Sequence, residues 1–505
     1  MMFSIVRMYS NRGQMKELIK SFLLFSLTIS ALILTGTVFM TEQPENVDLP
    51  EVYDKTDLIK MIRPQNYVFS FGDLFIKIYD DEYTPEGSYK NILVRSEYED
   101  VLKNFIDLSM IPNDGIFKLQ VEPINESLWR DLETRRYVKV NYPVDIPFDA
   151  LLKMYGYDDV VSELDYRISS ILMLVNTTDV IYFYDAKNDD YYKIYGVSPE
   201  NWIDGIYNEV DEVDENKSEH DSYKSVEERY ALLKTSLKKY DLLEENMLLT
   251  PLSTHISYPA YRIASSVDIE KSAENVFDHD LNFVRKSVYS DNEVIYMYGY
   301  SEKLLRKNSD GSLEYTAKVS DNSSKLSLDF LAGLNMSLQQ INKMYDLGST
   351  LYLSGYSQIE SPNEVETVYS FNYTKNGIPY YINDTRDGSI IEVKFTNDEL
   401  VRARMTPLIT YDELDYHQED RSFSQILKVN EVMFVLGYEN DNPDATIEKA
   451  DYFLMCLQEM TSLETRYMVI GNHLIPTWHI RIDETYYVIN LLTSRIIMID
   501  GEVIE

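Results

Sequence analysis

YSFNYTKNGIPYYI, residues 369–382, is the segment that decides the fold of this chain. Two runs rich in tyrosine and phenylalanine, which favour strands, flank the dipeptide Asn376-Gly377. Asn-Gly readily adopts the positive φ angles that a two-residue hairpin turn requires. The segment therefore predicts a β-hairpin and, with it, an antiparallel sheet.

The residues on either side of this hairpin predict a helix and two further strands. Before the hairpin, apolar side chains recur every three or four residues, which is the spacing of one helix face. They predict a helix over 327–346 and are Leu328, Leu331, Leu334, Leu338, Ile341 and Met344. After the hairpin, strands are predicted at 389–395 and 399–405.

The end of the chain repeats this order of elements. A helix is predicted to begin at Asn442, a capping residue, with Pro443 in its first turn. The strands predicted after this helix are 466–470, 477–482, 485–490 and 494–499. A helix followed by antiparallel strands thus occurs at 327–405 and again at 443–499, which hints at a duplicated unit.

The first half of the chain shows the same mixture of elements. A hairpin is predicted from residues 67–79, a helix begins at the capping box of Ser96 and Glu99, and a short helix covers about 147–155. The strands predicted between and after them are 116–121, 136–141, 167–175, 179–185 and 191–195. The fold class is therefore α+β, with antiparallel sheets and packed helices.

The N-terminal region contains an apolar segment, SFLLFSLTISALILTGTVFMT, Ser21–Thr41, without a charged side chain. As a helix it is long enough to span a hydrocarbon layer of about 30 Å. Four basic residues precede it against the single acid Glu17, namely Arg7, Arg12, Lys16 and Lys20. Because basic flanks stay in the cytoplasm, a single-pass membrane protein with an extracytoplasmic body is predicted.

A cleaved signal peptide is the alternative interpretation of this segment. Cleavage requires small side chains at the end of the apolar run, but Val38, Phe39 and Met40 are bulky. The prediction is therefore a retained helix. The domains then expected are a cytoplasmic head 1–20, a transmembrane helix 21–41, a tether 42–57, an N-terminal α+β ectodomain 58–205, an acidic linker 206–223, a middle α+β domain 224–410 and a C-terminal α+β domain 411–505.

The charge of the chain limits its partners. The formal net charge is −37, and the segment NEVDEVDENKSEHDS, residues 208–222, is mostly acidic and polar. An acidic body repels the phosphate backbone, so binding to nucleic acid is not expected. Positively charged partners remain compatible with this charge, as does a role in solubility alone.

The sequence shows no recognisable catalytic or cofactor motif. It contains no GxxxxGK[ST], GxGxxG, GxSxG or HExxH, and Cys456 is the only cysteine. We therefore expect no enzymatic activity, no cofactor and no metal site. Calcium binding at the acidic turns 185–190 and 439–444 is an alternative, although neither matches the twelve-residue calcium loop.

Tyrosine is abundant, with 42 residues and clusters at 191–195, 296–300 and 486–487. Tyrosine packs well in half-buried strands, which is the structural explanation. It is also enriched at protein-binding surfaces, and sugar stacking is a third alternative.

Several motifs resemble those of the YycH family. In the first half they are RPQNYVFSFGD (63–73), LQVEPINESLW (119–129), VKVNYPVDIPFDALLKMYG (138–156) and ILMLVNTTDVIYFYDAKNDDYYKI (171–194). In the second half GSLEY (311–315), YSFNYTKNGIP (369–379) and IPTWHI (475–480) are similar to signatures that YycH shares with YycI. The acidic linker is longer than the resemblance leads one to expect.

This resemblance implies regulation by contact. Such a protein binds a sensor histidine kinase of the WalK/YycG type at the membrane, together with a YycI-like partner, and so influences cell-wall metabolism in Gram-positive bacteria. Because small residues let helices approach closely in lipid, Ser26, Ser30 and Thr37 are predicted to contact the partner. An extracytoplasmic scaffold or wall-associated binding protein is the alternative, followed by a hydrolase with an acidic cleft.

Overall fold

The computed structural model describes most of residues 58–79, 102–157, 166–195, 247–249, 259–345, 351–414 and 460–503, with gaps inside several of these ranges. The chain separates into two compact units, Met1–Val52 and Tyr53–Glu505, and every described residue belongs to the second. The predicted transmembrane helix, the acidic linker and the helix beginning at Asn442 lie outside the described residues. None of the described helices has the length and apolarity needed to cross a membrane.

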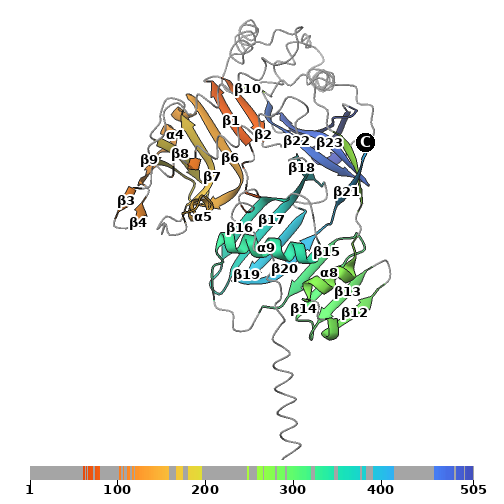
Figure 1. Ribbon diagram of the computed structural model, residues 1–505. Helices are drawn as coiled ribbons and strands as arrows, with labels where there is room; N and C mark the ends of the chain where they lie inside the picture. Colours follow the sequence, from red (N-terminus) through yellow and green to blue (C-terminus); the bar gives the residue numbers. More distant parts are fainter. Residues whose placement is uncertain are drawn as a thin grey trace, which may run out of the picture. The chain divides into compact units, whose positions relative to one another are not determined.

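The first part of the described chain forms an eight-stranded sheet (Figure 1). All neighbouring strands in it are antiparallel except β10 and β2, which pair in parallel. In order the strands are β10 (Met247–Leu249), β2 (Leu74–Tyr79), β1 (Asn66–Phe71), β6 (Arg136–Pro147), β7 (Arg167–Leu174), β8 (Val180–Asp185), β9 (Asp190–Tyr195) and β5 (Gln120–Ile124). The predicted hairpin is confirmed, since β1 and β2 pair directly with Ser70 opposite Phe75.

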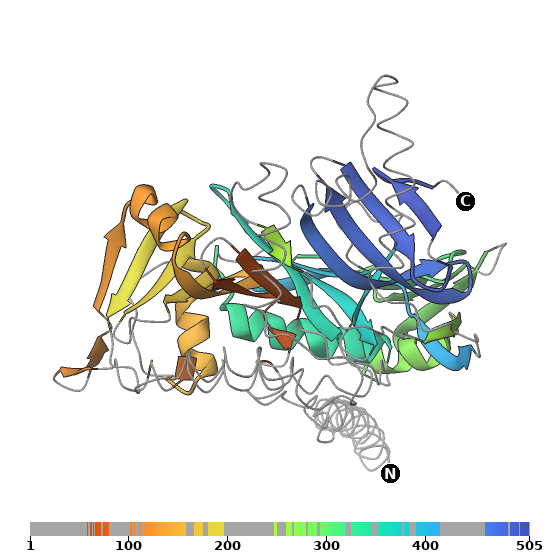
Figure 2. The ribbon, with the colours of Figure 1, turned by 90° about the horizontal axis from the view of Figure 1, so that it is seen from above.

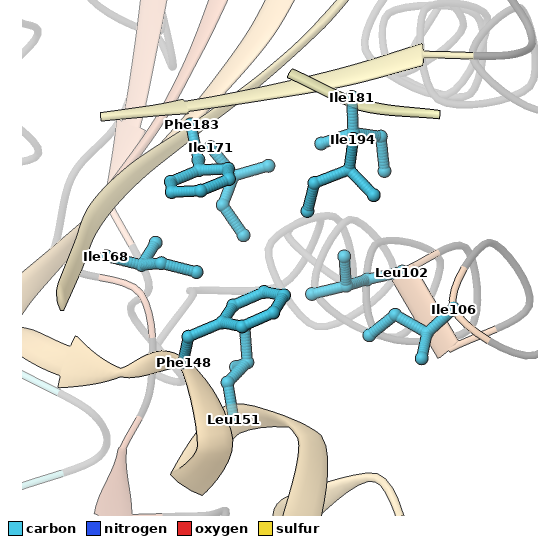
Figure 3. Close-up of a pocket in the computed structure, with 9 residues that line it drawn as sticks. All are labelled: Leu102, Ile106, Phe148, Leu151, Ile168, Ile171, Ile181, Phe183 and Ile194. Atoms are coloured by element: carbon cyan, nitrogen blue, oxygen red, sulfur yellow. The ribbon is translucent and has the colours of Figure 1, made fainter. Parts of the chain in front are cut away.

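One face of this sheet is covered by α5 (Phe148–Met154) and by a helical segment that includes Leu102 and Ile106. Nine apolar side chains from these elements and from β7, β8 and β9 converge there (Figure 3). They leave a cavity of about 20 Å³, room for one water molecule but without polar partners for it. We therefore interpret this cavity as a dry packing gap in the core and not as a ligand site.

The second part forms a longer run of paired strands. Its path, in order, is β12 (Val284–Val288), β13 (Val294–Tyr298), β14 (Lys303–Lys307), β15 (Leu313–Ala317), β20 (Glu399–Met405), β19 (Ile391–Thr396), β17 (Val365–Lys375), β18 (Ile378–Tyr381), β22 (Met460–Ile470), β23 (His473–Ile482), β24 (Thr485–Asn490), β25 (Arg495–Ile499) and β26 (Glu502–Val503). Three more strands join beside this path, namely β16 (Leu351–Glu360), β11 (Ala260–Ala264) and β21 (Ile409–Leu414). A separate pair is formed by β3 (Ile111–Asn113) and β4 (Ile116–Lys118).

The hairpin of residues 369–382 lies in the middle of this path. Its strands β17 and β18 pair in antiparallel with Lys375 opposite Ile378, so the hairpin predicted from the Asn-Gly dipeptide is confirmed. Residues 376–377 themselves lie outside the described residues. β18 also pairs in parallel with β22, where Tyr380 lies opposite Tyr467. Strands that precede residue 410 in the chain and strands that follow it therefore belong to one hydrogen-bonded sheet.

Helix α9 (Phe330–Met344) covers one face of the strands around β17 (Figure 2). It begins at Asp329, whose carboxylate accepts hydrogen bonds from the backbone N–H groups of Leu331 and Ala332. The helix packs closely on the sheet at Gly333, because the Tyr369 hydroxyl donates to the Phe330 carbonyl at 2.9 Å and lies beside that glycine. The helix predicted over 327–346 is thus confirmed and is shorter at both ends.

Several short elements differ from the prediction. The helices α4 (Glu126–Leu132) and α8 (Ile269–Val276), and the strands β12, β14, β15 and β16, were not expected from the sequence pattern. Both helices start at a side-chain cap, Asn125 and Asp268 respectively, which is the signal that could have found them. The α+β class with antiparallel sheets agrees with the described part of the structure.

Candidate interaction surface

The predicted partner-binding residues Ser26, Ser30 and Thr37 lie outside the described residues, as does Cys456. Their proposed role therefore stays a prediction. In the described part of the chain, no group of three or more His, Cys, Asp or Glu side chains is arranged to hold a metal ion.

The acidic turn at 185–190 is organised by its own hydrogen bonds. The buried carboxylate of Asp185 accepts from the backbone N–H groups of Arg167 at 2.8 Å and Lys187 at 3.1 Å. It also accepts from the side-chain amide of Asn188 at 2.6 Å. These bonds satisfy the carboxylate and explain the turn without a bound cation. The other acidic turn, 439–444, is not among the described residues.

A buried polar cluster surrounds His479 on β23. The Thr477 hydroxyl donates to the Arg466 carbonyl, so it accepts from His479 Nε2, 2.9 Å away. The other ring nitrogen, Nδ1, then accepts from the Tyr486 hydroxyl. This network assigns the neutral Nε2–H tautomer to His479.

The environment of His479 keeps its ring uncharged. Burial lowers the pKa of His479 well below its usual value of 6.5, and nearby Arg466 lowers it further. The ring also makes an edge-to-face contact with Tyr381, with centroids 4.8 Å apart. Because both ring nitrogens are engaged and the side chain is buried, His479 holds the sheet together rather than acting on a substrate.

The most exposed apolar side chains gather on the outer strands β12–β14 and the turns next to them. Five of the eleven large apolar side chains that are exposed in the described part come from residues 283–319. Tyr300 is 96% exposed, Phe283 69%, Val288 68% and Tyr289 54%. Such side chains concentrated on one small region indicate an interaction site.

Strands β13 and β14 are also apolar on both faces. Tyr296 and Leu305 lie opposite each other and are buried in the core. On the other face Ile295, Met297 and Leu304 are half-buried and pack against none of the hydrophobic clusters of the described residues. We call this face, together with the exposed side chains of Phe283, Val288, Tyr289 and Tyr300 around it, the β12–β14 surface. Val288 itself lies opposite Val294, on the face that Tyr296 shares.

Strand β12 ends the sheet at this surface (Figure 1), and no described strand pairs with its outer edge. The backbone N–H of Tyr289 donates to the Glu293 carbonyl at 2.9 Å, which fixes the alternation of hydrogen bonds along the β12–β13 ladder. Bonded pairs recur at every second residue in an antiparallel ladder, so Ser287 and Arg285 point toward β13. The N–H and C=O groups of Val284, Lys286 and Val288 therefore point away from the sheet.

The charge of this region differs from that of the whole chain. Residues 283–319 carry six basic and five acidic residues, against a net charge of −37 overall. Arg306 pairs with Glu293 at 2.6 Å, and Lys286 lies 3.6 Å from Glu270. Arg285 is exposed, and none of the described residues forms an ion pair with it. The edge strand thus presents positive charge in a predominantly acidic protein.

Sequence reasoning found this surface only in part. The tyrosine cluster 296–300 lies at this surface, and the explanation by packing in a half-buried strand applies to one of its members. Tyr296 is buried in the core, whereas Tyr300 is the most exposed large side chain of the described residues. Strand β12 was missed because its sequence VRKSV carries adjacent charges in the middle.

The comparisons with known proteins give similarity of structure without similarity of sequence. No protein-family model and no curated protein matches the chain. The chain is similar to the crystal structure of YycH from Bacillus subtilis, with 10% sequence identity and a TM-score of 0.44, over 86% of this chain and 97% of that one. It is also similar to an uncharacterized protein from Eubacterium rectale, with 9% identity and a TM-score of 0.29, over 50% and 86%.

Proposed function

We propose that this chain is a membrane-anchored extracytoplasmic regulator that binds a sensor histidine kinase of the WalK/YycG type and modulates its activity. Regulation of this kind would control cell-wall metabolism, and it would involve a YycI-like partner. The protein acts by contact and has no catalytic step of its own.

The observation that carries this proposal is the β12–β14 surface. A protein that works by contact needs apolar side chains outside its own core, and large side chains exposed by 54–96% meet that need. Aromatic side chains such as Tyr289 and Tyr300 suit protein–protein contact because they add area at low entropic cost.

Two features of the sequence support the membrane location and the partner. The apolar segment Ser21–Thr41 with its basic flank predicts an anchor whose C-terminal side is extracytoplasmic. The motifs that resemble the YycH family link such an anchored body to a sensor kinase. Ser26, Ser30 and Thr37 recur on one face of the predicted helix and would contact the kinase within the membrane.

A pull-down of the full-length protein from detergent-solubilised membranes tests the proposal, with partners identified by mass spectrometry. We expect recovery of a sensor kinase, and loss of that recovery when Ser26, Ser30 and Thr37 are replaced together by leucine. Thr28→Leu is the matched control, because position 28 lies on the opposite face of the predicted helix.

The outcomes separate the proposal from its alternatives. Kinase captured by wild type and by Thr28→Leu, and lost from the triple variant, supports regulation through the helix. Capture by all forms would move the contact to the ectodomain. Absence of any kinase from every sample would contradict the proposal and favour a scaffold or wall-associated binding protein.

A further inference from the structure

We infer that β12 is a strand-addition site, at which an extended segment of a partner protein pairs with the outer edge and places acidic side chains beside Lys286 on one face and Arg285 on the other. This inference rests on the proposed function, because it describes how the ectodomain takes hold of its partner. It adds the mode of binding and the chemistry of the bound segment.

The backbone provides the first step of the argument. The N–H and C=O groups of Val284, Lys286 and Val288 point outward, and none of the described strands pairs with them. Three residues in this alternation offer up to six hydrogen bonds to an added strand. Hydrogen bonding to the main chain supplies affinity, and the side chains beside the edge supply selectivity.

The charges of β12 decide what kind of strand fits. Lys286 is at the centre of the strand and Arg285 is next to it, on the opposite face. In an antiparallel pair of two β12 strands centred on this position, each Lys286 would face the other copy's Lys286, and like charges directly opposite are destabilising. A segment with two adjacent acidic residues at its centre would instead present one carboxylate to Lys286 on one face and one to Arg285 on the other.

The apolar side chains define the ends of the bound segment. Phe283 precedes the strand, and Val288 and Tyr289 close it, so apolar surface lies on both sides of the charged centre. The half-buried Ile295 and Met297 lie on the adjacent strand, on the face that Arg285 shares. The partner segment is therefore an extended peptide with an acidic centre and apolar residues on either side.

The main experiment removes one outward N–H group and preserves the shape of the edge. Val288→Pro takes away a donor that β13 does not use, and proline is tolerated at such outward positions of edge strands. Val288→Ile keeps both the N–H group and an apolar β-branched side chain, so it is the matched control. In pull-downs of the full-length protein, we expect capture of the kinase to fall by at least about tenfold for Val288→Pro and little for Val288→Ile.

A second pair of variants tests the charge. Arg285→Glu combined with Lys286→Glu should reduce capture by a similar factor and should make the remaining capture insensitive to salt. Lys271→Glu is the control, because Lys271 is an exposed cation on α8 and lies outside the β12–β14 surface. Circular dichroism of each purified variant verifies that the fold is retained.

A photocrosslinking residue at Tyr289 reports directly on what lies beside the edge. A crosslink to the kinase that is lost with Val288→Pro supports the inference. Crosslinks that join two copies of this chain, or equal capture by wild type, Val288→Pro and the charge-reversed form, would overturn it and leave the proposed function standing. If the kinase is captured by none of the forms, including wild type, the proposed function fails first.

Discussion

The inner and outer strands of the second sheet are built by different rules. On the inner strands β17 and β19, the side chains that face the core are buried, as Tyr369 and Val393 are, and those on the other face are polar except Val368. On the outer strands β13 and β14, the second face carries Ile295, Met297 and Leu304. An antiparallel sheet that faces water on one side normally alternates apolar and polar residues, so the outer strands depart from the pattern that their own neighbours keep.

Ion pairs show how the inner strands use their second face. Lys394 pairs with Glu366 at 2.8 Å and Arg402 pairs with Glu314 at 2.8 Å, both across neighbouring strands and partly exposed. Each such pair contributes about 0–1 kcal/mol, so it makes the face soluble more than it makes the fold stable. The contrast teaches that the outer strands leave apolar side chains on a face where solubility alone would favour charges.

The largest expected effect comes from two adjacent leucines on β14. Leu305 is fully buried, whereas Leu304 is half-buried on the β12–β14 surface. Leu305→Ala should lower the free energy of unfolding by about 2–5 kcal/mol, and Leu304→Ala by less than about 1 kcal/mol. Urea unfolding of the full-length protein in detergent measures both. Similar losses for the two variants would mean that the second face is part of the core, and the comparison would then break.

A smaller effect on the free energy of unfolding is expected from the protonation of His479 as pH falls. His479 lies on β23, where it is buried like the core-facing residues of the inner strands. Its folded-state pKa is lowered by burial, so below pH 6.5 the unfolded state binds a proton that the folded state does not. The contribution of the neutral His479 ring to the free energy of unfolding is therefore fully present above pH 6.5. Below pH 6.5 this contribution falls by about 1.4 kcal/mol per pH unit, until the folded-state pKa is reached.

The non-titrating variant His479→Gln isolates this contribution. The difference in unfolding free energy between wild type and His479→Gln should shrink by about 2 kcal/mol between pH 6.5 and pH 5. Denaturant titrations at the two pH values give the slopes. Parallel pH profiles for the two proteins would show that His479 takes up its proton in the folded state as easily as in the unfolded one.

The smallest of these effects concerns the close approach of α9 to the inner strands. A Cβ atom at Gly333 would lie 2.7 Å from Leu328 Cδ2 and would also meet the Tyr369 hydroxyl. Gly333→Ala should destabilise by about 1 kcal/mol, because an overpacking cost of about 1–3 kcal/mol exceeds the roughly 1 kcal/mol gained in helix propensity. In the Tyr369→Phe background the alanine should cost less, which a double-mutant cycle detects. A stabilising Gly333→Ala would show that the helix can move off the sheet without penalty.

Local signals in the sequence predicted the long and strongly patterned elements. The strand pairs β17–β18 and β1–β2 and the regular apolar spacing of α9 were all found, because each depends on residues close together in the chain. The short helices α4 and α8 were missed because seven or eight residues give too few repeats of a helical pattern.

Non-local pairing could not be predicted in the same way. The parallel contact of β18 with β22, and the pairing of β11 with both β21 and β23, join residues separated by about 80 to 210 positions, and no local propensity encodes such partners. The β12–β14 surface was only partly foreseen, because the tyrosines of one cluster differ in their surroundings: Tyr296 is buried on β13, whereas Tyr300 is exposed in the turn that follows this strand. The partner contacts predicted for Ser26, Ser30 and Thr37 remain predictions.

The position of β18 determines which truncations, deletions and insertions this chain can tolerate. β18 completes its pairing with a strand that is synthesised more than 75 residues later, and β11 needs β23, which is synthesised later still. A premature stop codon before residue 460 would therefore remove more than the last strands, since it would leave unpaired edges deep inside the earlier part of the protein. Deletions that end near residue 410, and fusion junctions placed there, should destabilise the strands on both sides of that position. Insertions should be tolerated in surface turns, such as the one at Tyr300.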